Sequence, residues 1–139
     1  MTQIQLKRVK GDFGFEAGDA DGHVLHIDGS PEIGGQGSGA RPMHILLMAL
    51  GGCSGIDIVS ILKKQRQEVT GFNMRIEGER ESGKDVSLWK TIHIVFELAG
   101  QIDPDKAKRA CELSMNKYCS VAETLKRAGA TITWEVSIN

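Results

Sequence analysis

One long apolar segment limits what this chain can fold into. Residues 42 to 67 predict a single helix from Pro42 to about Gln67, and a proline suits the first turn, where no backbone N–H bond is lost. At about 1.5 Å per residue this helix is roughly 37 Å long. That is longer than one small domain needs, so we expect a second subunit to cover part of it.

Three glycines lie in the interior of this helix, around Cys53 in the segment GGCSG. Together they should cost roughly 3 kcal/mol of helix stability relative to alanine. Close packing of another backbone, a bend, or a ligand that must reach Cys53 would offset that cost. We expect the Gly51-Gly52 face to pack against another helix. A plain core cysteine on a tightly packed helix is the alternative interpretation.

The rest of the chain predicts an α+β fold in a single domain, residues 1–139. Residues 3–28 alternate like strands broken by turns, and residues 29–41 form a glycine-rich loop. Alternation over 69–80, a turn over 82–85 and a second strand over 88–98 predict an antiparallel pair, and residues 131–138 predict a last strand. Asp103 and Pro104 are typical of a helix start.

Cys119 and Cys111 receive different interpretations. Cys119 directly precedes the capping box Ser120 to Glu123, and a helix amino terminus favours a thiolate. A small buried residue at a helix junction is the alternative. Cys111 belongs to an apolar stripe at helical spacing and is expected in the core. The stripe consists of Ala107, Ala110, Cys111, Ser114, Met115 and Tyr118.

Composition and motifs exclude several classes of function. The net charge is −1 and no block of Lys and Arg stands apart, which argues against nucleic acid or an anionic membrane as partner. The amino terminus lacks an apolar signal core, and the run Ile45–Leu50 is too short to span a bilayer. We therefore expect a cytoplasmic protein whose three cysteines are redox groups, metal ligands or core residues.

Metal and cofactor motifs are weak. The chain has no Cys-x-x-Cys or His-x-x-x-His pair, so no metal site is expected. The segment starting at Gly35 half-matches a dinucleotide fingerprint but lacks the strand that should come immediately before it. No bound cofactor is expected.

Two motifs in order carry a family resemblance. The segment PMHILLMALGGCSGIDIVSILKK around Cys53 and the segment KYCSVAETL around Cys119 resemble the OsmC/Ohr family, in particular an OsmC-like subgroup without an assigned substrate. The resemblance implies an intertwined homodimer, with antiparallel sheets wrapped around two long central helices and two sites at the interface.

The resemblance also implies a thiol peroxidase chemistry. Cys53 would attack the O–O bond of an organic hydroperoxide and become a sulfenic acid. Cys119 would condense with it to a disulfide, which a dithiol reductant reopens. The resemblance implies no metal and no tightly bound cofactor.

The chain departs from the peroxidase members at two positions. It has Gly11-Asp12-Phe13 where they place an arginine, and Met43 where they place a glutamate. That arginine stabilises the reactive thiolate, so we expect a slow peroxidase. Arg41 and Arg8 are the candidates to replace it. Asp57, one turn after Cys53, would disfavour a thiolate if it pointed the same way.

Two further hypotheses stay open beside the peroxidase. In the first, the protein is a non-catalytic dimeric binding module that holds a small apolar ligand at the subunit interface. In the second, it is a structural dimer with inert thiols. The pocket for substrate or ligand is expected to be lined by Phe13, Phe15, Met43 and Leu46.

Overall fold

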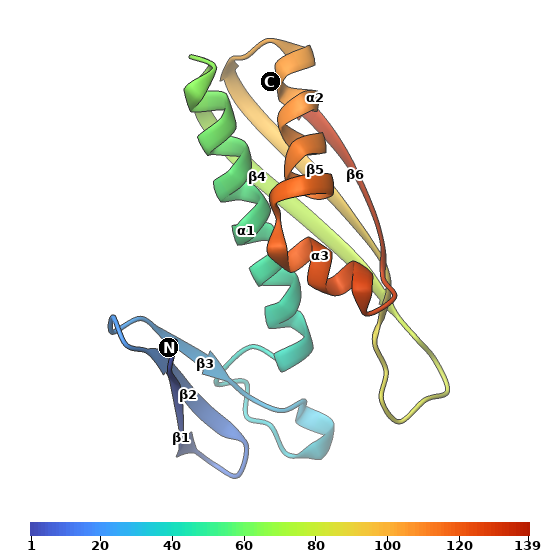
Figure 1. Cartoon of the computed structure of the whole chain (residues 1–139). Helices are drawn as coiled ribbons and strands as arrows, with labels where there is room; N and C mark the ends of the chain where they lie inside the picture. Colours follow the sequence, from blue (N-terminus) through green and yellow to red (C-terminus); the bar gives the residue numbers. More distant parts are fainter. The chain divides into compact units, whose positions relative to one another are not determined.

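The computed structural model describes residues 1–139, which divide into two compact units, Met1–Leu46 and Leu47–Asn139 (Figure 1). The protein is of the α+β class, as predicted. The first unit is built from strands and a loop, and the second contains a sheet covered by helices.

The first unit is a three-stranded antiparallel sheet in the order β1-β2-β3. Its strands are β1 (Ile4–Lys10), β2 (Gly14–Asp19) and β3 (Val24–Ile27), and a short 3-10 helix η1 (Pro31–Ile33) lies in the following loop. The predicted strands and the turns between them are confirmed.

One carboxylate organises the glycine-rich loop that follows β3. The buried Asp28 side chain accepts hydrogen bonds from the backbone of Gly29 at 2.7 Å, Gln36 at 2.9 Å and Ser38 at 3.1 Å, and from the Ser38 hydroxyl at 2.8 Å. These bonds, above all that from Gln36, lower the pKa of Asp28 to about 2. The loop is thus held by its own polar contacts. It leads from β3 into a long helix, and the strand after that helix belongs to a different sheet, unlike the βαβ unit of a dinucleotide site.

The second unit has the sheet order β4-β5-β6 with helices between its strands. Its elements are α1 (Pro42–Lys64, which begins in the first unit), β4 (Glu68–Arg80), β5 (Trp89–Gln101), α2 (Pro104–Leu113), the π-helical turn η2 (Ser114–Tyr118), α3 (Ser120–Arg127) and β6 (Thr131–Ile138). β4 and β5 are antiparallel as predicted, but β6 runs parallel to β5. The sheet is therefore mixed, because α2, η2 and α3 carry the chain back before β6 begins.

The core lies between the helices and one face of this sheet, where α1, α2 and α3 are seen on the same side in Figure 1. Side chains alternate along β4 and β6, as predicted, so that one face is apolar and the other carries ion pairs such as Arg75 with Glu97. The ring of Phe96 lies 6.2 Å from that of Phe72 and 6.5 Å from that of Trp134. Buried residues of α1 recur at Leu50, Ser54, Ile58 and Leu62.

Close packing explains two of the three glycines in α1. A Cβ atom on Gly51 would lie 3.0 Å from Ile76 Cδ1, and one on Gly55 would lie 2.8 Å from Met74 Cε. Both glycines therefore face β4, so the expectation that Gly51 packs against another helix is wrong within this chain. Gly52 faces open space, with nothing within 4 Å of such an atom.

α1 is long and apolar enough to cross a bilayer by length and composition, with a mean hydropathy of 2.1. This revises the expectation based on the run Ile45–Leu50 alone. The core helix of a soluble protein meets the same criteria, so length and hydropathy alone do not identify α1 as a membrane-spanning helix. Only 33% of the most apolar window is buried within one chain, which leaves much apolar helix surface exposed.

Candidate functional site

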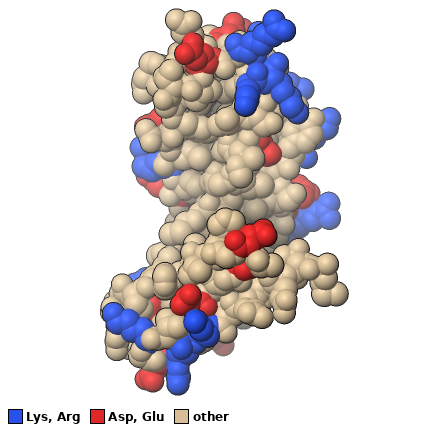
Figure 2. Space-filling model, turned by 90° about the vertical axis from the view of Figure 1, so that its left-hand side faces the viewer, with Lys and Arg blue, Asp and Glu red and all other residues tan.

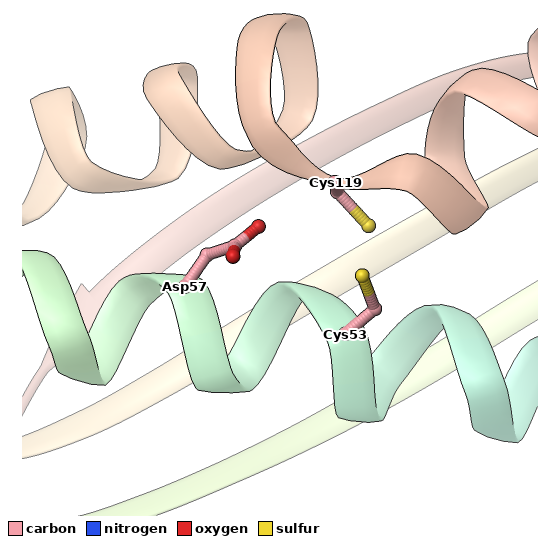
Figure 3. A group of neighbouring side chains, drawn as sticks. All are labelled: Cys53, Asp57 and Cys119. Atoms are coloured by element: carbon pink, nitrogen blue, oxygen red, sulfur yellow. The ribbon is translucent and has the colours of Figure 1, made fainter.

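The structure brings Cys53 and Cys119 together. Cys53 is half-buried on α1, and Cys119 is 3% exposed at the start of α3. Their sulfur atoms lie within 4.8 Å of each other and point toward one another across the gap between the two helices (Figure 3). Both thiols are free. A modest side-chain movement would bring the sulfurs to bonding distance.

A π-helical turn brings Cys119 to this position. The N–H of Cys119 donates to the carbonyl of Ser114 at 2.8 Å, five residues earlier, and Lys126 of α3 donates to the carbonyl of Met115. The sequence predicted one regular apolar stripe through Tyr118, but the wider turn leaves Tyr118 51% exposed. Such turns occur often at functional sites.

Cys119 is itself the amino-terminal cap of α3. The N–H of Ala122 donates to Cys119 Sγ at 3.4 Å, and the extended backbone of Cys119 lets the helix begin at Ser120. The predicted capping box with Ser120 as cap is therefore wrong. Glu123, its expected partner, instead bonds Arg127 at 3.0 Å. A thiol thus takes the place that an oxygen usually has at a helix start.

Burial dominates the electrostatics of Cys119. It raises the pKa of Cys119 to about 11, although the Ala122 N–H acts in the opposite direction. The neighbouring Cys53 and the charge of Asp57 raise the pKa further. The expectation that the helix terminus favours a Cys119 thiolate is therefore outweighed. Burial also raises the pKa of Cys111 to about 12, and this residue lies in the core as predicted.

Asp57 is the residue whose contacts the sequence did not reveal. Its carboxylate lies on the same side of α1 as Cys53 and beside Cys119 (Figure 3). It accepts a hydrogen bond of 2.9 Å from the buried hydroxyl of Ser114, where the π-helical turn begins. A serine within an otherwise apolar stripe was the available signal, because a buried hydroxyl requires a partner.

Two groups of side chains could hold a metal ion. In the first, Cys53, Asp57 and Cys119 place one ligand atom each within 4.8 Å of the others. The second contains Asp19 and His23 in the turn between β2 and β3. There His23 Nδ1 lies 2.9 Å from Asp19 Oδ2, and Asp19 Oδ1 also accepts from the His23 backbone at 2.9 Å. These bonds account for the second group as an ordinary turn.

Two open grooves lie beside Cys119 and Asp57. One, of about 620 Å³, is lined by Cys119, Tyr118, Glu123 and Arg127 among others. The other, of about 510 Å³, contains Asp57 and again Tyr118. Tyr118 thus borders both grooves.

The four residues predicted to line a ligand pocket all belong to the first unit, whereas the cysteines belong to the second. The Phe13 ring lies against Gly34, and Phe15 sits in β2 opposite Ile27. Met43 and Leu46 lie on the first turns of α1. Their role in binding stays a prediction, as does the replacement of the missing arginine by Arg41 or Arg8.

Comparison with known proteins identifies the family. The model of the family described as OsmC-like protein matches residues 35–135, which include both cysteines and Asp57. The chain belongs to the OsmC-like family. This confirms the resemblance that the motifs around Cys53 and Cys119 carried.

The similarity to several known proteins extends over nearly the whole chain. Protein YhfA of Escherichia coli K12 is 39% identical, over 96% of this chain and 97% of its own length. A hypothetical protein from Aquifex aeolicus is 28% identical with a TM-score of 0.82, covering 100% of this chain and 98% of its own. An organic hydroperoxide resistance protein OsmC from Legionella pneumophila is 15% identical with a TM-score of 0.73, covering 99% and 96%. The last likeness shows the fold alone.

The three thiols of this OsmC-like protein should react in a fixed order. Only the thiolate reacts with iodoacetamide, so a thiol with a raised pKa reacts faster as the pH rises toward that value. We expect Cys53, which is half-buried, to be modified first, and Cys111 only on unfolding. Between about pH 7 and 9.5 the rate at Cys119 should climb about tenfold per unit without levelling. Peptide mass spectrometry measures each rate, and a Cys119 rate already constant near pH 7 would contradict the assignment.

Proposed function

We propose that this protein reduces organic hydroperoxides through Cys53 and Cys119, as a thiol-dependent peroxidase. The observation that carries the proposal is the pair of free thiols from separate elements with sulfurs within 4.8 Å. A half-buried thiol beside a buried one suits a reaction in which the first meets the substrate and the second resolves the product. Solved structures of the same fold include proteins described as organic hydroperoxide resistance proteins, which supports the assignment.

In the first step the Cys53 thiolate attacks the outer oxygen of the hydroperoxide. The S–O bond forms as the O–O bond breaks, sulfur is oxidised to a sulfenic acid, and the alkoxide leaves as an alcohol after taking up a proton. Cys53 has this role because it is the more exposed of the two thiols. Cys119 is too deeply buried to meet a bulky substrate first.

In the second step Cys119 attacks the sulfenic sulfur of Cys53. The S–S bond forms, the S–O bond breaks, and hydroxide leaves as water with the proton of the Cys119 thiol. The sulfurs need to approach by only a few ångströms, since they already lie within 4.8 Å of each other. A dithiol reductant then reopens the disulfide by exchange.

The charges at this site favour a slow reaction. Burial, together with the neighbouring Cys53 and the charge of Asp57, raises the pKa of Cys119, which slows its attack on the sulfenic sulfur. The resemblance to peroxidase members implies an arginine beside the reactive thiol, and this chain has Gly11-Asp12-Phe13 at the matching position. We infer modest turnover for this reason.

We also propose that the protein is a homodimer joined through α1. One stripe of α1, away from the residues that face β4 and Cys119, is apolar and uncovered in one chain, with Met48, Ile56 and Val59 all exposed and Gly52 between them. Figure 2 shows few charged side chains in the middle of the side on which α1 lies in Figure 1. A glycine without neighbours in an exposed apolar stripe suits close contact with a second helix.

The dimer proposal predicts the behaviour of one charge substitution. Ile56 is 73% exposed in a single chain, so Ile56→Asp should leave the fold of that chain intact. Placing a carboxylate in an apolar interface should raise the dimer dissociation constant at least about a hundredfold. Sedimentation equilibrium measures it. Val86→Asp is the matched control, because Val86 is 75% exposed on the loop between β4 and β5. Equal effects of both substitutions, or a monomeric wild type, would rule out this interface.

The peroxidase proposal predicts how three cysteine variants behave. With an organic hydroperoxide and a dithiol present, Cys53→Ser should consume substrate at the background rate, because the attacking sulfur is gone. Cys119→Ser should still react once at Cys53 but turn over slowly, since no disulfide can form. Cys111→Ser should match the wild type, because Cys111 is a buried core residue. Peroxide consumption is the measurement.

If the wild type itself consumed hydroperoxide only at the background rate, the peroxidase proposal would be contradicted. The binding-module hypothesis would then stand in its place, and an apolar ligand retained through purification would be visible by native mass spectrometry.

A further inference from the structure

A carboxylate without a cationic partner lies beside the two thiols. Asp57 is half-buried, and its hydrogen-bond partner is the neutral hydroxyl of Ser114 at 2.9 Å. The ion pairs of the chain all involve other residues, so no Lys, Arg or His nitrogen lies within 4.0 Å of this carboxylate. The carboxylate and the two sulfur atoms beside it are therefore all available as ligands of a cation.

The three groups are arranged for a single ion. Cys53 Sγ, Cys119 Sγ and an Asp57 oxygen all lie within 4.8 Å of one another. Zinc binds thiolates at about 2.3 Å and carboxylates at about 2.0–2.2 Å, so ligand atoms around one tetrahedral ion are about 3.5–3.8 Å apart. Small side-chain adjustments would therefore let one ion contact all three atoms. Figure 3 shows the side chains of Cys53 and Asp57 on α1 converging with that of Cys119, which lies just before α3.

We propose that reduced Cys53, Cys119 and Asp57 form a binding site for Zn²⁺. Two sulfurs favour zinc over magnesium or calcium, which prefer oxygen ligands. Binding displaces the two thiol protons to solvent and leaves the fourth coordination position to water. Nothing in this site depends on peroxidase activity, because it requires only that both thiols be reduced.

Hydrogen bonds behind the ligands support this assignment. The Ser114 hydroxyl donates to one oxygen of Asp57, which leaves the other oxygen available to the ion. The N–H of Ala122 donates to Cys119 Sγ at 3.4 Å and orients that sulfur. Partners of this kind position metal ligands in many proteins. Cys53 and Asp57 both lie on α1, one turn apart, so the helix fixes the spacing of these two ligands.

Zinc binding and disulfide formation exclude each other at this site, since each uses both sulfurs. Bound zinc would hold the thiols as thiolates and shield them from alkylation and oxidation. Oxidation to the disulfide would remove two of the three ligands and release the ion. The site would thus report the redox state of the protein through its zinc content.

Competition with a chromophoric zinc chelator tests the site, using the full-length reduced protein without oxygen. We expect one zinc ion per chain, with Cys111→Ser unchanged. Asp57→Asn should weaken binding by at least about tenfold, and the exposed Asp85→Asn is its matched control. Wild type alkylated at Cys53 should lose the ion, which avoids any folding defect of a cysteine variant. Co²⁺ as a probe should show sulfur-to-metal charge-transfer absorption that this alkylation removes.

Three results would overturn the proposal. One is the absence of zinc binding by the reduced wild type. Another is equal affinity of Asp57→Asn and wild type, which would mean adventitious capture by two thiols. The third is loss of binding in a Cys111→Ser variant that keeps the circular dichroism spectrum of the wild type. A wild type that binds zinc without consuming hydroperoxide would contradict the peroxidase proposal alone, so the two proposals fail separately.

Discussion

Close contact between α1 and β4 determines where the reactive groups lie. Because Gly51 and Gly55 have no side chains, Ile76 and Met74 of β4 approach the helix backbone directly. This contact fixes the rotation of the helix about its own axis. Cys53 and Asp57, one turn apart, then face the start of α3. A larger residue at either glycine would displace the helix and separate the two thiols.

The second determinant is the irregular backbone between α2 and α3. A regular helix through Tyr118 would not end in a cap at Cys119, whereas the π-helical turn ends with Cys119 in an extended conformation. The same turn begins at Ser114, whose hydroxyl holds Asp57. One local irregularity therefore positions both the second thiol and the carboxylate. The positions of the two thiols and of Asp57 thus depend both on the packing of α1 against β4 and on the π-helical turn.

Much of this arrangement could be predicted from the sequence, since it follows from local periodicity. Alternation predicted β4 and β6 and their buried faces, and the Asp103 cap of α2 is confirmed by its bonds to the N–H groups of the first turn. The two cysteine motifs predicted the family. The parallel pairing of β6 could not be predicted in this way, because strand direction depends on how the connecting helices return to the sheet.

The details of the site required three-dimensional contacts. Burial, which reverses the expected effect of the helix terminus on Cys119, depends on side chains distant in the sequence. The bond between Ser114 and Asp57 links residues in different helices and leaves no periodic signal. Glycine spacing showed that something approaches α1 closely, but only the structure shows that β4 does so at Gly51 and Gly55, while Gly52 remains open.

The central claim is that Cys53 and Cys119 form one redox pair, and disulfide mapping tests it most directly. Reduced protein would be treated with one equivalent of cumene hydroperoxide, quenched with alkylating agent and digested for mass spectrometry. The account predicts an intramolecular bond between Cys53 and Cys119 with Cys111 alkylated. A bridge that contains Cys111, or three thiols that all remain free, would contradict it.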